Sequence, residues 1–188
     1  MSDLDLRQTV ERVVSALEAL GVRFHITGGL ASSYYGEPRT TRDADFVVRL
    51  GHSEGTKLVT ALSREFLIEA EAVRQAIASR GLFQALDQDT LMKADFHVGE
   101  RIEGELDRSV VHELFEGFSA PLVSKEDAIL SKLIWVQEGS DRSRTDILGM
   151  LLDPTPFDLG WVRTQARVVG CGAILSELEN QASRVGDG

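Results

Sequence analysis

The chain has 188 residues, of which 43% are apolar and 27% are charged. This balance is typical of a globular domain, and it excludes a largely disordered, a collagen-like or a membrane-embedded chain. Thirty acidic residues against twenty basic ones give a net charge of −10, which argues against a protein that coats nucleic acid through a basic surface. With one cysteine and no signal-peptide pattern at the amino terminus, a cytoplasmic protein without disulfides is expected.

The first half of the chain alternates helix and strand patterns. Apolar residues at helical spacing predict a helix over 6–20, and alternation predicts a strand over 22–26 that runs into Gly28 and Gly29. The same reasoning predicts, in chain order, a short helix over 30–35, a strand over 44–50, helices over 56–64 and 71–80 around a short strand at 66–68, and a hairpin with arms 82–86 and 91–98.

The second half changes character. Residues 100–119 carry no clear pattern, and a short strand is expected at 122–123. From residue 124 onward only helices are predicted: one opened by a Ser124–Asp127 capping box, one over 143–152, one from an N-cap at Thr155 to 169, and one over 173–183. The expected fold is therefore α/β (α+β), with a mixed or antiparallel sheet flanked by helices over 1–120 and a helical region packed on it over 121–188.

Acidic residues on two strands indicate a metal site. Asp43 and Asp45 are two apart at a strand, so their carboxylates share one face at about 6–7 Å. Such carboxylates repel unless a cation lies between them, and Mg²⁺ is commonly held by one or two carboxylates plus substrate phosphates. Asp95, on a third strand, can complete the site or take a proton from an attacking hydroxyl.

The diglycine suggests the other half of the substrate. Backbone without side chains at Gly28 and Gly29 can approach a phosphate closely, and the following helix offers free N–H groups. Each feature alone is common, since Gly-Gly is usually only a tight turn and Asp-x-Asp is usually a solvated edge. Their order and spacing together are more specific, and they predict phosphoryl or nucleotidyl transfer.

The stretch from Ile26 to Val48 resembles the minimal nucleotidyltransferase domain of the DNA polymerase beta superfamily, with its Gly-Gly turn, Asp-x-Asp strand and third acid. More narrowly, Gly28-Gly-Leu-Ala and Arg39-Thr-Thr-Arg-Asp-Ala-Asp are similar to the AbiEii-type nucleotidyltransferases of toxin–antitoxin and phage-abortive systems. The segments that begin at Ser124 and Ser143 resemble the helical half of that family, so the resemblance covers roughly residues 20–180.

The resemblance implies a role for each matching residue. Gly28 and Gly29 would contact the triphosphate of an NTP, and Asp43 and Asp45 would hold Mg²⁺. Asp95 would be the third carboxylate, which activates the acceptor hydroxyl or binds a second metal ion. Three basic residues would neutralise phosphate charge: Arg39, Arg42 and Lys132.

The expected activity is Mg²⁺-dependent transfer of NMP from an NTP to a hydroxyl acceptor, with a tRNA 3′ end, a protein side chain or an aminoglycoside-like small molecule as acceptor. The toxin resemblance also implies a possible antitoxin partner. The alternative is a catalytically idle nucleotidyltransferase fold that serves as a binding or regulatory protein. No membrane partner is expected.

Other residues have less specific interpretations. His97 shares a strand face with Asp95 and is a candidate to enter the site. Trp135 lies on an amphipathic helix and is expected to pack between helices. The acidic run from Glu100 to Asp107 is expected to be a solvated face or a mobile loop. Two basic groups are candidate clusters: Arg39, Arg42 and Arg49, and Lys132, Arg142 and Arg144.

Overall fold

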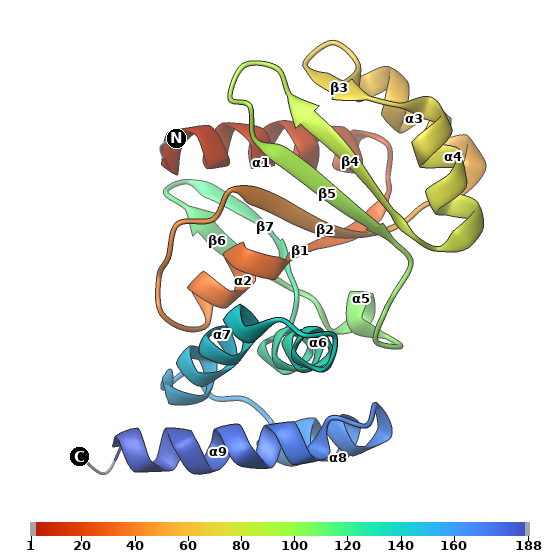
Figure 1. Cartoon of the computed structure of the whole chain (residues 1–188). Helices are drawn as coiled ribbons and strands as arrows, with labels where there is room; N and C mark the ends of the chain where they lie inside the picture. The colour runs from red at the N-terminus through yellow and green to blue at the C-terminus, as the bar shows by residue number, and fades with distance from the viewer. Residues whose placement is uncertain (1–2, 187–188) are drawn as a thin grey trace.

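A computed structural model describes residues 3–186, and within them one seven-stranded mixed sheet forms the centre of the molecule (Figure 1). The strand order is β3-β4-β5-β2-β1-β7-β6. The strands are β1 (Arg23–Thr27), β2 (Asp43–Arg49), β3 (Phe66–Ile68), β4 (Leu82–Asp87), β5 (Lys93–Val98), β6 (Val110–Phe115) and β7 (Phe118–Leu122). Neighbours pair antiparallel except β2 with β5 and β1 with β7, which pair parallel.

Helices lie on both sides of this sheet, with α3 and α4 at one end of the molecule and α6 to α9 at the other (Figure 1). They are α1 (Asp3–Ala19), α2 (Gly28–Tyr34), α3 (His52–Leu62), α4 (Ala70–Ser79), α5 (Glu105–Arg108), α6 (Lys125–Gln137), α7 (Asp141–Leu152), α8 (Leu159–Val168) and α9 (Gly172–Gly186). The α/β class with a mixed sheet is thus confirmed. None of the described helices is long and apolar enough to cross a membrane.

The pleat of the central strands separates core from site. Phe46 on β2 lies in register with Phe96 on β5, and their rings stack with centroids 5.4 Å apart. Phe83 on β4 extends this stack at 4.7 Å from Phe96. Because successive side chains point to opposite faces of a sheet, burying these rings turns Asp45 and Asp95 to the other face. The hydrophobic core therefore orients the carboxylates.

Most predicted elements are confirmed to within a few residues, and three helix starts differ from the prediction, among them that of the helix expected over 56–64, which begins at His52. The short helix after β1 begins at Gly28, so the diglycine forms its first turn and does not precede it. The helix expected from Thr155 begins at Leu159, because Asp158, not Thr155, is the N-cap and accepts the N–H of Trp161 at 2.8 Å. The Ser124 cap is confirmed, since its side chain accepts the N–H of Asp127.

Residues 100–119, which carry no clear sequence pattern, form α5, all of β6 and the start of β7. The strand β6 is an edge strand, and Val110 and Val111 on it are exposed. Its side chains therefore lack the regular alternation of a half-buried strand, which is the signal that sequence reading depends on.

Candidate active site

A cleft of about 780 Å³ lies on the carboxylate face of the sheet. Its walls come from the strands β1, β2 and β5, from the start of α2 and the segment after it, and from α6 and α7. The helices α6 and α7 both contact α2, which carries the glycines. Segments far apart in the sequence therefore meet around one opening.

The acidic residues lie on two neighbouring strands of the cleft floor. Asp45 on β2 is in register with Asp95 on the parallel strand β5, and Thr27 on β1 pairs with Asp45 from the other side. Asp43 lies two residues earlier on β2, is exposed, and lines the cleft together with Asp45. The structure therefore brings the three predicted acids to one face of the sheet.

Burial and like charge act on these carboxylates. Burial raises the pKa of Asp45, and Asp43 adds to the rise, while the N–H of Gly29 and the charges of His97 and Lys132 oppose it. Burial also raises the pKa of Asp95, and the neighbouring carboxylates contribute in the same direction. A cation bound here would relieve the repulsion.

Asp95 stands somewhat apart from the other two acids. Its Oδ1 accepts a hydrogen bond of 2.9 Å from the side-chain amide of Gln84 on β4. Asp43 and Asp45 are among the residues that line the cleft, whereas Asp95 is not. Among the described residues, no group of three His, Cys, Asp or Glu side chains is arranged to hold a metal ion.

The diglycine packs directly against Asp45. Gly28 has a φ of +64°, and a Cβ on it would lie 1.9 Å from Oδ2 of Asp45. The N–H of Gly29 points to the same oxygen at 3.4 Å, and a Cβ on Gly29 would lie 2.5 Å from Oγ1 of Thr41. Only glycine therefore permits this approach of the helix start to the carboxylate.

The predicted basic residues Arg39, Arg42 and Lys132 all line the cleft. Asp146 on α7 holds two of them: its carboxylate accepts hydrogen bonds from Arg39 at 2.9 and 3.0 Å and an ion pair from Lys132 at 2.8 Å. Although burial opposes ionisation, these two cations lower the pKa of Asp146 overall. Sequence reasoning placed Asp146 only within a family-like stretch and missed this role, because its partners come from two other segments.

Each basic cluster proposed from the sequence is divided between the cleft and the surface. Arg142 lines the cleft, whereas Arg144 pairs with Glu177 at 3.1 Å. Arg49 pairs with Glu100 at 3.4 Å and does not line the cleft. The length of β2 separates Arg49, at its far end, from Arg39 and Arg42, which precede the strand, and the turn of α7 separates Arg142 from Arg144.

Three further residues line the cleft: His97, Trp135 and Glu105. His97 does line the cleft, and burial lowers its pKa. Trp135 is 40% exposed and lines the cleft, so the expectation that it packs between helices is wrong; the guanidinium of Arg101 lies 4.9 Å from its ring centroid. Glu105 also lines the cleft and is buried, so it is wrong to treat the whole acidic run as solvated or mobile.

Comparison with known proteins gives a fold but no close relative. No family model matches the chain, and no curated protein matches it in sequence. Solved structures do match: an antigenic nucleotidyltransferase-like protein from Paracoccidioides brasiliensis has a TM-score of 0.59 at 19% identity, and the match covers 96% of this chain and 94% of that chain.

Two further structures have the same fold over the whole chain. The antibiotic-resistance factor ANT(2'')-Ia has a TM-score of 0.57 at 13% identity, covering 99% of both chains. JHP933 from Helicobacter pylori has a TM-score of 0.51 at 12% identity, covering 100% of this chain and 97% of that chain. The protein therefore has the fold of nucleotidyltransferase-like proteins.

Proposed function

We propose that the protein is a Mg²⁺-dependent nucleotidyltransferase that moves NMP from an NTP to a hydroxyl group of a small-molecule acceptor. The observation that carries this proposal is the contact of Gly28 with Asp45 in a cleft whose other wall carries Lys132 and Arg39. Carboxylates beside basic residues and a side-chain-free helix start suit a metal-bound triphosphate. The nucleotidyltransferase-like fold supports the same reaction class.

The donor set fits a hard divalent cation. Asp43 and Asp45 supply carboxylate oxygens on one strand face, and no Lys or Arg of the described chain forms an ion pair with either. The described residues hold no ready three-residue metal group, which agrees with the preference of Mg²⁺ for one or two carboxylates completed by phosphates and water. When bound, Mg²⁺ would neutralise developing charge on the phosphates.

Other residues of the cleft would bind the triphosphate and accept the proton of the acceptor hydroxyl. Arg39, Arg42 and Lys132 bind the triphosphate, with Asp146 holding the first and last of these in place. The acceptor hydroxyl attacks the α-phosphorus, the bond to the pyrophosphate oxygen breaks, and the hydroxyl proton passes to the carboxylate of Asp95. The raised pKa of Asp95 suits it to accept that proton.

A small-molecule acceptor is favoured over a large RNA by the net charge of −10. ANT(2'')-Ia, whose fold matches along the whole chain, is an antibiotic-resistance factor. A toxin that modifies tRNA or protein, with an antitoxin partner, would instead transfer label to a macromolecule.

The test is label transfer from each of the four α-³²P NTPs with Mg²⁺, using cell RNA, cell protein and an aminoglycoside panel as acceptors. We expect label on a small molecule with the wild type, and a loss of at least about a hundredfold in Asp43→Asn plus Asp45→Asn. Full activity in that double variant would contradict the proposal.

Asp95→Asn separates an enzyme from an idle nucleotide-binding domain. If Asp95 takes the proton, this variant binds NTP as the wild type does and loses turnover by about a hundredfold or more. Mg²⁺-dependent NTP binding by the wild type without transfer to any acceptor would favour the idle domain, which the position of Asp95 outside the cleft lining also suggests.

A further inference from the structure

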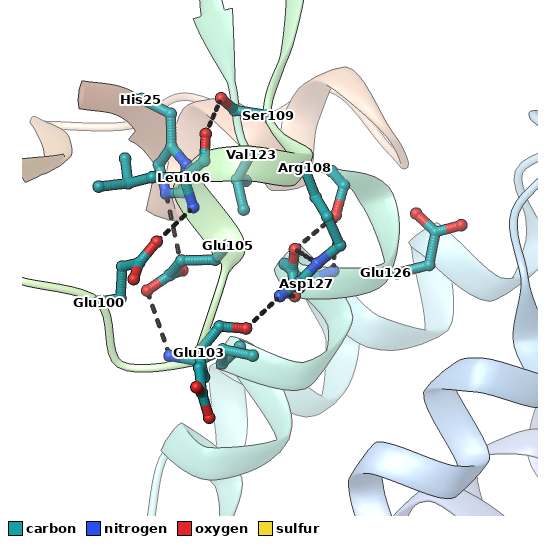
Figure 2. Close-up of polar contacts among 12 residues, drawn as sticks. His25, Glu100, Glu103, Glu105, Leu106, Arg108, Ser109, Val123, Glu126 and Asp127 are labelled. Atoms are coloured by element: carbon teal, nitrogen blue, oxygen red, sulfur yellow. Dashed lines mark hydrogen bonds and ion pairs between the residues drawn. The ribbon is translucent and has the colours of Figure 1, made fainter. Parts of the chain in front are cut away.

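Glu105 is a buried carboxylate in the cleft wall with one oxygen unused. Its Oε1 accepts the backbone N–H groups of Arg101 at 2.7 Å and Ile102 at 3.2 Å. Its Oε2 accepts no hydrogen bond from the described residues and faces Nε2 of His25 at 3.6 Å, beyond hydrogen-bond distance (Figure 2). The side chain is only 3% exposed, yet it lines the cleft.

The cations around Glu105 are engaged elsewhere. The guanidinium of Arg101 pairs with Glu138 and lies over Trp135. Arg108 donates two hydrogen bonds to Asp127, at 2.8 and 2.9 Å (Figure 2). No Lys or Arg of the described chain forms an ion pair with Glu105, and a buried carboxylate without a cation is costly.

His25 does not supply the missing charge. It is fully buried on β1, and neither of its ring nitrogens has a hydrogen-bond partner among the described residues. Burial lowers the pKa of His25 to about 4, so the ring is neutral at pH 7. Burial also raises the pKa of Glu105, and the charges of Asp127 and Glu100 add to that rise. The buried ring of His25 therefore faces an oxygen of Glu105 that accepts no hydrogen bond from the described residues.

We propose that Oε2 of Glu105, with His25 behind it, binds a protonated amine of the acceptor. An ammonium group supplies both the charge and the hydrogen-bond donor that this oxygen lacks. Arg39 and Lys132 line the cleft around Asp146, whereas the one arginine that lines it beside Glu105 among the described residues, Arg101, is paired with Glu138. A cleft divided in this way matches an anionic nucleotide and a cationic acceptor bound together. This inference rests on the proposed function and names its acceptor class.

The experiment measures binding alone, by calorimetry on the full chain at pH 7 without NTP or metal. The probes are kanamycin and its fully N-acetylated form, which keeps the hydroxyl groups and loses the positive charges. The variant is Glu105→Gln, whose amide oxygen can still accept the two backbone N–H groups. The matched control is Glu103→Gln, which removes the same charge from an exposed position just before α5.

We expect kanamycin to bind the wild type and Glu103→Gln equally, and Glu105→Gln about ten- to a hundredfold more weakly. The N-acetylated probe is expected to bind the wild type as weakly as kanamycin binds Glu105→Gln. Equal binding of the two probes to the wild type, undiminished binding to Glu105→Gln, or no binding of kanamycin up to millimolar concentration would overturn the inference. The comparison of probes on the wild type does not depend on the folding of any variant.

This test is independent of the transfer reaction. Asp43→Asn plus Asp45→Asn is expected to abolish transfer, whereas the weakening of kanamycin binding by Glu105→Gln is expected to persist when it is measured in that double-variant background. If amine binding requires Glu105 while no NMP is transferred, the acceptor site stands and the proposed reaction fails. If NMP is transferred and Glu105→Gln does not weaken amine binding, the proposed reaction stands and the amine site at Glu105 fails.

Discussion

Gly28 and Asp45 are packed so closely that a side chain on the glycine would coincide with the carboxylate. A Cβ at residue 28 would lie 1.9 Å from Oδ2 of Asp45 and 2.4 Å from its Cγ. The glycine also has a φ of +64°, in the left-handed region. Packing against Asp45 is therefore enough to require glycine at residue 28, independently of any contact with a bound nucleotide.

Gly28→Ala should be much more damaging than a matched glycine substitution. Gly21→Ala is the control, since Gly21 has a φ of +63° and nothing within 4 Å of its would-be Cβ. We expect Gly21→Ala to lower the free energy of unfolding by about 1–2 kcal/mol through backbone strain alone. Gly28→Ala should lose about 1–3 kcal/mol more, because Asp45 must move.

Urea unfolding of the two variants and the wild type measures this difference. NMP transfer should fall in Gly28→Ala and persist in Gly21→Ala, because only the first displaces Asp45. Equal stability of the two variants would show that the carboxylate moves aside at little cost.

Asp146 should stabilise the protein in a pH-dependent way. Its pKa is lowered in the folded state by Arg39 and Lys132, so its contribution is present above its unfolded pKa of about 4 and is lost as the pH falls through the folded pKa. Asp146→Asn should lower the free energy of unfolding at pH 7 by about 1–3 kcal/mol. The deficit should begin to shrink as the pH falls below about 4, where the unfolded carboxylate takes up a proton, and it should vanish only below the lowered folded pKa.

The control for Asp146 is Glu138→Gln, which removes the ion pair of Glu138 with Arg101 at a half-exposed site. That change should cost less than about 0.5 kcal/mol at any pH. A deficit in Asp146→Asn that stays constant from pH 7 to pH 3 would mean that the carboxylate charge is not what stabilises this contact.

His25 should make the protein sensitive to mild acid. Its folded pKa is about 4, whereas an unfolded histidine titrates near 6.5. Between these values the unfolded state binds the proton and the folded state does not, so stability falls as the pH falls from about 6.5 to 4, by about 3 kcal/mol in total.

His25→Leu should remove that loss. Unfolding free energies of the wild type and variant, measured from pH 8 to pH 4, should differ by a constant above pH 7 and converge or cross below pH 6. Burial raises the pKa of Glu105, which faces His25 at 3.6 Å, and this gives a slope of opposite sign, so the comparison is made in a Glu105→Gln background. Parallel curves across the whole range would show that His25 does not titrate as its burial implies.

Much of the site could be predicted because it depends on local pattern. The alternation of side chains along β2 places Asp43 and Asp45 on one face of the strand, whatever the fold. The Asp-x-Asp motif and the diglycine before it can both be identified in the sequence. The class of the fold follows for the same reason, since helix and strand periods are properties of short segments. The Ser124 cap is another local feature that the structure confirms.

Tertiary structure alone decided which side chains meet across the chain. Asp146 holds Arg39 and Lys132 although 107 residues separate it from the arginine, and local period carries no information about such a pairing. The same holds for Glu105. Its place in an acidic run predicts a solvated side chain, whereas in the structure it is buried and faces His25. The sequence by itself determined the two-residue spacing of Asp43 and Asp45. The tertiary structure decided the pKa shifts of the acids, their partners and the shape of the cleft, because burial and ion pairing depend on contacts between distant segments.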